Sequence, residues 1–154
     1  MVNLDEIDYK ILDIIQTNGR IKRNEIADIV GLTLPAVSDR LKKLEDETYI
    51  LGYFAKLNHK LLGKDVTAFI TATVDSSKHF AAFLEHVQKN DEIIECHAIT
   101  GTGTHLLKVR VDNTSDLEKL LAKIQSWQGV IQTRTSVVLS TQKETSRISI
   151  KAKK

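Results

Sequence analysis

The chain has 154 residues, of which 42% are hydrophobic and 27% are charged. These fractions are typical of globular proteins, and the length allows one large domain or two small ones but excludes large multidomain machinery. The single cysteine, Cys96, cannot form an internal disulfide, which suits a reducing compartment. Because no apolar run approaches ~20 residues and the N-terminus is acidic where a signal peptide would be basic, we expect a cytoplasmic protein without a membrane span.

The net charge of +2 is unevenly distributed along the chain. Residues 1–60 hold 9 basic and 10 acidic side chains, residues 61–141 hold 8 and 9, and residues 142–154 hold 5 and 1. Bulk charge therefore does not predict nucleic-acid binding, which would need a local basic surface made by the fold. We expect the basic tail, 142–154, to be a disordered solubilising end, with nonspecific contacts to a polyanion as the alternative.

Apolar residues recur at helical spacing up to about Glu47, which predicts a first half made of helices. The first helix should begin at Asp5, because its side chain can cap the free N–H groups, with Asp8 completing a weak capping box. We expect Gly19 to end this helix in a left-handed conformation.

Two more short helices follow. The second should run from residue 22 or 23 to Val30 and end at Gly31, and Thr33 should cap the third, with Pro35 in its first turn. The expected buried stripe of the third helix is Leu34, Val37, Leu41 and Leu44. Three short helices, with a glycine turn between the last two, match the helix-turn-helix plan.

The rest of the chain alternates between strand and helix patterns. Residues 50–58 predict an extended strand that leaves the helical domain, and Gly63 with Lys64 predicts a turn. The further elements expected are strands at 66–74, 93–100, 105–112 and 130–140, a helix at 77–89 and a helix capped near Thr114 or Ser115. This βαββαβ order is the split ferredoxin-like unit, with both helices on one sheet face. The predicted fold class is α+β, with a helix-turn-helix domain at 1–50, a linker strand and turn at 51–64, a ferredoxin-like domain at 65–141 and the tail.

The third helix is the strongest candidate for a functional surface. Its apolar stripe leaves short polar groups on the opposite face, where they could approach base edges, while lysines and an arginine could neutralise phosphates. The candidate DNA-contacting residues are Thr33, Pro35, Ser38, Asp39, Arg40, Lys42 and Lys43, with Arg20, Lys22 and Arg23 before the second helix. The alternative for all of them is an ordinary solvated, mixed-charge surface.

The order of motifs along the chain resembles the Lrp/AsnC (feast/famine) family of transcription regulators. The resemblance is carried by Leu4-Asp5, Asp8, Ile11-Leu12, Gly19-Arg20, Glu25-Ile26-Ala27, Gly31-Leu32-Thr33, Val37, Arg40-Leu41, Leu44-Glu45, Ile50, Gly52-Tyr53 and Leu62-Gly63. It implies an N-terminal DNA-binding domain, a linker strand that pairs in a dimer, and a C-terminal domain that senses amino acids and assembles dimers into tetramers or octamers.

Two positions depart from the family pattern. Where the family usually has glycine after the third helix, this chain has Glu47-Thr48-Tyr49. Because a left-handed Thr48 would be strained, we expect a different exit geometry there. The turn between the two central strands commonly reads Gly-x-x-Asp in the family, whereas Thr104 stands here at the acidic position.

This second departure bears on ligand binding. A threonine hydroxyl offers a ligand ammonium a weaker bond than a carboxylate does, although backbone N–H groups at glycines could still accept a ligand carboxylate. The candidate effector-binding residues are Gly101, Thr102, Gly103, Thr104 and His105, with Thr133 and Thr135 resembling the family's polar pocket wall. The alternatives are a plain hairpin turn and a solvated sheet face.

No metal site, cofactor or catalytic constellation is predicted. The five histidines form no compact ligand motif; with 101–104 as the turn, His97 would pair with Lys108 and not with His105. Trp127 is expected in the core or in an interface. No nucleophile motif, phosphate loop or dinucleotide fingerprint is present.

Our hypothesis is a homo-oligomeric, nucleoid-associated regulator that binds double-stranded DNA and responds to a free amino acid or related metabolite held between subunits. Two small domains would be only marginally stable alone, and an unpaired linker strand, with Tyr53 and Phe54 on opposite faces, would be an exposed edge. One alternative is an architectural DNA-binding protein without an effector, which Thr104 favours. The other, an enzyme built on the ferredoxin-like half, rests on fold analogy alone.

Overall fold

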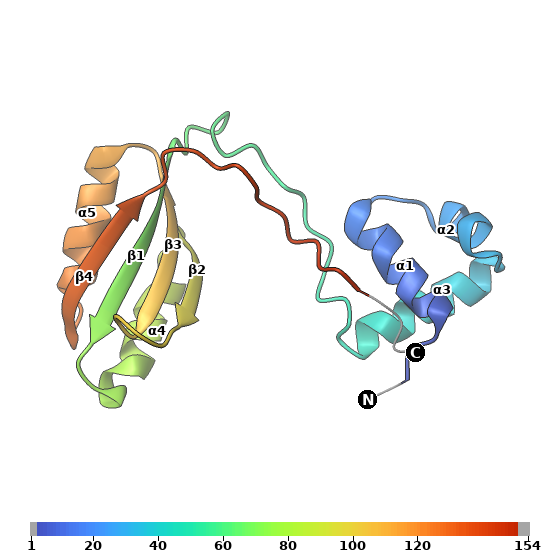
Figure 1. Ribbon diagram of the computed structural model, residues 1–154, viewed down its shortest axis with the longest axis horizontal. Coiled ribbons are helices and arrows are strands. Elements are labelled where there is room, and N and C mark those ends of the chain that lie inside the picture. Colours follow the sequence, from blue (N-terminus) through green and yellow to red (C-terminus); the bar gives the residue numbers. More distant parts are fainter. Residues whose placement is uncertain (1–2, 151–154) are drawn as a thin grey trace. The chain divides into compact units, whose positions relative to one another are not determined.

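A computed structural model describes residues 3–150 of the chain (Figure 1). The chain divides into two compact units. The first, called here the helical unit, contains the residues up to Lys56 and the segment that starts at Lys143, and the second, the sheet unit, is Leu57–Gln142. The boundary near residue 56 and the return at 143 show that the C-terminal segment belongs with the N-terminal helices.

The helical unit contains α1 (Glu6–Thr17), α2 (Arg23–Val30) and α3 (Leu34–Asp46). Ile11 of α1 and Val37 and Leu44 of α3 are fully buried in one core, which agrees with the predicted apolar stripes. Leu34 differs from its prediction, because 48% of the side chain is exposed. It is the first residue of α3, and the helical turns that face the core begin at Val37.

Local hydrogen bonds determine where the helices begin and end. The capping box at α1 is complete, since the Asp8 N–H donates to the Asp5 carboxylate at 2.8 Å and the Asp5 N–H donates to the Asp8 carboxylate at 3.2 Å. The predicted left-handed end at Gly19 is wrong. The helix ends at Thr17, and the cap residue Asn18 has φ −139° and donates its N–H to the Ile14 carbonyl. At the second helix Gly31 has φ 72°, as predicted.

The exit of α3 corrects the expectation for Thr48. Its φ is 59°, so the chain keeps the left-handed conformation without a glycine. The Thr48 N–H donates to the Glu45 carbonyl at 3.0 Å and the Tyr49 N–H to the Leu44 carbonyl at 2.9 Å. These two bonds are the Schellman pattern, which satisfies carbonyls at the end of a helix. They hold Thr48 in a conformation that crowds its Cβ.

The sheet unit has the predicted βαββαβ order. Its elements are β1 (Val66–Val74), a 3-10 turn η1 (Ser77–His79), α4 (Phe80–Gln88), β2 (Ile93–Ala98), β3 (His105–Val111), α5 (Thr114–Gln125) and β4 (Val130–Val137). The antiparallel strand order is β2-β3-β1-β4. Both helices cover one face, where Ile70, Phe83 and Leu107 are fully buried, and Trp127 is in this core as expected. The other face carries half-exposed side chains such as Phe69.

The register between β2 and β3 differs from the sequence prediction by two residues. His105 pairs with Ala98, and His97 pairs with Leu106 instead of Lys108. The connection therefore runs from Ile99 to Thr104, closed by a hydrogen bond from the Ile99 N–H to the Thr104 carbonyl at 3.0 Å. His97 and His105 are still not cross-strand partners.

Residues 51–58 are not assigned as a strand within this chain. A ladder needs a partner, and the predicted pairing was with a second subunit. Large apolar side chains in this segment and the following turn point to solvent, with 88% of Leu51, 88% of Phe54 and 84% of Leu61 exposed. The linker strand therefore remains a prediction that depends on assembly.

The left-handed Thr48 generates a stability prediction. Thr48→Gly should raise the free energy of unfolding by about 0.5–1 kcal/mol, because relief of the steric cost exceeds the added entropy of the unfolded chain. Glu47→Gly is the matched control, since Glu47 has φ −83° and gains no relief. Urea unfolding followed by circular dichroism measures both. Equal destabilisation by the two glycines would contradict strain at Thr48.

Candidate DNA-binding helix and ligand-binding turn

The outward face of α3 presents the short polar residues that the sequence singled out. Pro35, Asp39 and Lys42 are exposed and Ser38 is half-buried, on the side of the helix away from the buried Val37 and Leu41. Thr33 caps the helix, since its hydroxyl accepts from the Ala36 N–H at 3.4 Å. Short polar and basic side chains of this kind can contact base edges and phosphates.

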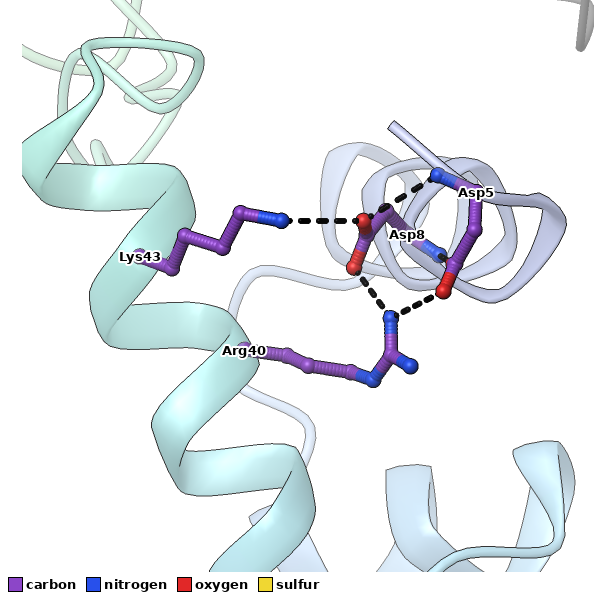
Figure 2. A network of polar contacts seen from close by, with 4 residues as sticks. All are labelled: Asp5, Asp8, Arg40 and Lys43. Carbon is purple, nitrogen blue, oxygen red and sulfur yellow. Dashed lines mark hydrogen bonds and ion pairs between the residues drawn. The ribbon is translucent and has the colours of Figure 1, made fainter. Parts of the chain in front are cut away.

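A buried carboxylate fastens α3 to α1 (Figure 2). Asp8 is 1% exposed, and the Arg40 Nη1 donates to its Oδ1 at 2.7 Å and to the Asp5 Oδ2 at 2.7 Å. The Lys43 ammonium lies 3.7 Å from the other Asp8 oxygen. Arg40 and Lys43 reach back from α3 towards the start of α1, so much of their charge serves the contact between these helices.

The pKa values of this network follow from its hydrogen bonds. The backbone N–H of Asp8 lowers the pKa of Asp5 most, against a raising effect of burial, and Arg40 lowers it further. The bonds to Asp5 and then to Asp8 raise the pKa of Arg40. Because the pKa of Asp5 is lowered and that of Arg40 is raised, this ion pair contributes its full stabilisation above the ordinary pKa of an aspartate and loses it as the pH falls towards the lowered pKa of Asp5.

Arg20, Lys22 and Arg23 are exposed around the connection between α1 and α2. Nearby, the Tyr53 hydroxyl donates to the Glu45 carboxylate at 3.0 Å. Burial first, and then the bond to Glu45, raises the pKa of Tyr53 to about 12. Sequence reasoning missed this tie between the linker and the end of α3. Its only sequence signal is a tyrosine seven positions after the last residue of α3.

The turn between β2 and β3 is shaped by two glycines with positive φ, 94° at Gly101 and 88° at Gly103. A Cβ at Gly103 would lie 2.3 Å from the Thr71 methyl group, so this glycine permits close packing against β1. Around Gly101 the space is open, and Thr102 beside it is exposed. The open part of the turn is therefore Gly101 and Thr102.

The side chain of Thr104 is engaged within the fold. Its hydroxyl accepts from the Val74 N–H at 3.0 Å and lies 3.2 Å from the Ala72 carbonyl and 2.9 Å from the His105 Nδ1. His105 is 3% exposed and contacts the rings of Phe80 and Phe83, and burial lowers its pKa. Thr104 and His105 thus anchor the turn to β1 and the core.

Thr133 and Thr135 lie on the helix-covered face of β4, across from Ala72 and Ile70. The Thr133 hydroxyl accepts from the Gln125 Nε2 of α5 at 2.8 Å. Ala72 also pairs with His105, so the register brings Thr133 and His105 to the same end of the sheet with β1 between them. Both are turned towards the helices and not towards the open face.

Within residues 3–150, no three His, Cys, Asp or Glu side chains are grouped so that they could hold a metal ion. The described helices are also all too short or too polar to cross a membrane.

A three-helix DNA-binding arrangement followed by a βαββαβ unit defines a two-unit regulator, and comparison with known proteins agrees. Residues 4–50 match the model of a winged helix-turn-helix DNA-binding domain, and residues 67–148 match the Lrp/AsnC ligand binding domain. The chain belongs to the Lrp/AsnC family of DNA-binding transcriptional regulators.

The similarity to relatives extends over nearly the whole chain. The HTH-type transcriptional regulator FL11 of Pyrococcus abyssi is 37% identical over 97% of this chain and 99% of its own length. The leucine-responsive regulatory protein of Escherichia coli is 37% identical over 98% of this chain and 94% of its own. A transcriptional regulator of Neisseria meningitidis, solved as a complex with L-methionine, has a TM-score of 0.91 at 30% identity, covering 96% of this chain and 97% of that one.

The ion pair under α3 generates the second prediction. Arg40→Met should lower the free energy of unfolding by about 2 kcal/mol, because it leaves the buried Asp8 carboxylate with Lys43 as its remaining cation. In a double-mutant cycle with Asp8→Asn, the coupling energy should be at least about 1 kcal/mol.

Lys42→Ala is the control, because Lys42 is exposed on the outward face of the same helix and should change stability by less than about 0.5 kcal/mol. Urea unfolding of the four cycle members and the control provides the measurement. Additive effects of the Asp8 and Arg40 substitutions would show that the pair does not join α1 to α3.

Proposed function

We propose that this regulator reads double-stranded DNA through the outward face of α3. In this proposal Ser38 and Asp39 meet base edges, since an aspartate can accept from the amino group of cytosine in the major groove. Lys42 is the phosphate contact on this face, and Arg20, Lys22 and Arg23 supply further phosphate contacts from the connection between α1 and α2.

The observation that carries this proposal is that the three basic residues of α3 point to different sides of the helix. Arg40 and Lys43 lie at Asp8, whereas Lys42 is exposed beside Asp39. Fixing α3 through its inner side keeps its outer side rigid, and a rigid helix positions base-contacting groups more accurately than a mobile one. Arg40 and Lys43 act mainly by positioning, and any phosphate contact they add is secondary.

We also propose that the protein is a homo-oligomer, at least a dimer, with tetramers or octamers formed from it. The exposed Leu51, Phe54 and Leu61 of the linker region support this, because large apolar side chains exposed on a monomer are unfavourable in water. A two-fold pair of α3 helices would fit a pseudo-palindromic DNA site. The same proposal places the protein in the cytoplasm, associated with the nucleoid, and assigns it no enzymatic activity.

A free amino acid is the proposed effector. Two structural neighbours support it: the Neisseria regulator above and a feast or famine regulatory protein of Mycobacterium tuberculosis with a TM-score of 0.85, both solved with L-methionine. The open side of Gly101 leaves room for a ligand carboxylate at the turn. Thr104 favours a second candidate, an architectural DNA-binding protein without an effector, because its hydroxyl is bonded within the fold and no carboxylate takes its place.

Lys42→Ala tests the DNA interface. It should weaken binding to mixed-sequence duplex DNA and reduce the slope of log K against log salt concentration by about 1 for each subunit engaged. Fluorescence anisotropy across a salt series measures both quantities. Lys89→Ala, on the sheet unit, removes the same charge from an exposed site and should leave the slope unchanged. An unaltered slope for Lys42→Ala would remove α3 from the phosphate interface.

Thermal unfolding with each of the twenty amino acids at millimolar concentration tests the effector. A ligand at 100 times its dissociation constant stabilises the native state by roughly 2.7 kcal/mol, which gives a clear rise in the midpoint. The rise should be lost in Gly101→Val, which fills the open side of the turn. If none of the amino acids changes the midpoint or the DNA affinity, the architectural candidate replaces the sensor.

A further inference from the structure

The last described residues of the chain contact the first helix, α1. In the helical unit, the Arg147 guanidinium lies 2.9 Å from the Asp13 carboxylate of α1, and these residues are 134 positions apart in the sequence. The hydrogen bond from Arg147, followed by one from Gln16, lowers the pKa of Asp13. The expectation of a free, disordered tail is therefore wrong for the described part of the tail, which ends at Ile150.

Next to this ion pair, the side-chain amide of Gln16 forms two hydrogen bonds with the backbone of Ile148, as a neighbouring strand would. The Gln16 Nε2 donates to the Ile148 carbonyl at 2.9 Å, and the Ile148 N–H donates to the Gln16 Oε1 at 3.1 Å. The same Nε2 lies 3.0 Å from the Asp13 Oδ1, so the two anchoring side chains of α1 support each other. A two-way amide contact of this kind specifies a register, whereas a single ion pair specifies only proximity.

Two further contacts hold the ends of the segment. Near its start, the Lys56 ammonium donates to the Glu144 carbonyl at 3.0 Å and lies 3.4 Å from the Glu144 carboxylate. At its end, the half-buried Ile150 lines a hollow of about 420 Å³ together with Tyr9, Ile14 and Ile29 of α1 and α2. The contacts follow one another along the segment in chain order.

We propose that residues 143–150 form a strap that docks on the exposed face of α1 and gives the chain a second connection between the helical and sheet units. The chain leaves the helical unit at residue 56 and returns to it at 143, after β4. Residues 143–149 are exposed, and surface ion pairs and single hydrogen bonds are individually weak, so the docking is reversible.

The charges favour α1 over DNA as the partner of the described strap. Asp13 neutralises Arg147, and both anchoring residues, Asp13 and Gln16, lie on the side of α1 away from the fully buried Ile11 that packs with α3. The strap therefore binds α1 without contacting the outward face of α3. The strap can therefore be tested without DNA.

Hydrogen exchange in the full-length chain tests the strap. The Ile148 amide should exchange at least tenfold more slowly than the same amide in a free peptide of the tail sequence. Gln16→Ala and Asp13→Arg should each return its exchange to the free-peptide rate, and the charge swap Asp13→Arg/Arg147→Asp should restore protection relative to Asp13→Arg alone. Asp28→Arg, an equal charge change at an exposed site on α2, is the matched control and should leave protection intact.

The fluorescence of Trp127, the single tryptophan, reports whether the sheet unit remains folded in each variant. Exchange of Ile148 at the free-peptide rate in the unaltered chain would overturn the proposal, as would protection that survives both Gln16→Ala and Asp13→Arg. Since no DNA or amino acid is present, these outcomes are independent of the proposed regulatory function.

Discussion

The orientation of α3, the helix proposed to contact DNA, depends on one buried charge. Asp8 is enclosed where α1 meets α3, and a carboxylate in such a place is unfavourable unless cations and N–H groups compensate it. Arg40 and Lys43 supply the cations from α3, and the capping box supplies an N–H group from Asp5. Apolar packing alone would allow the helix to rotate or slide a little. The forked contact of Arg40 with Asp8 and Asp5 allows one arrangement.

The sheet unit also has a titratable side chain in its core, but this one is neutral. There the buried titratable group is His105, held among aromatic rings that favour its neutral form. Thr104 beside it bridges the end of β1 and the turn that follows β2. The sequence resemblance led us to expect an acidic residue at this position. In this chain Thr104 instead joins two strands, so its hydroxyl is part of the scaffold.

Much of the fold could be predicted from the sequence because its signals are local. Capping at Asp5 and Thr33, the glycine at position 31 and the change from helical to alternating patterns each depend on residues a few positions apart, and all of them appear in the structure. The βαββαβ order follows from the same patterns. The exposed residues of α3 were likewise predicted by helical periodicity, which separates an inner face from an outer one.

The errors arise where a long-range contact or a hydrogen-bond pattern overrides a local rule. Periodicity placed Arg40 and Lys43 on a flank of α3 but could not show that a carboxylate of α1 lies opposite. Propensity argued against a left-handed Thr48, yet two backbone bonds at the helix exit hold it there. The shift of two residues between β2 and β3 arose from assigning the turn to 101–104, whereas the connection begins at Ile99.

The contacts between α1 and the C-terminal strap also bear on how the protein is made. They join residues 132 and 134 positions apart, so α1 gains these contacts only after the whole sheet unit has been synthesised. The three-helix core needs none of these late residues and can form while the sheet is still being synthesised. A chain that stops after β4 would thus contain both folded units and lack the strap.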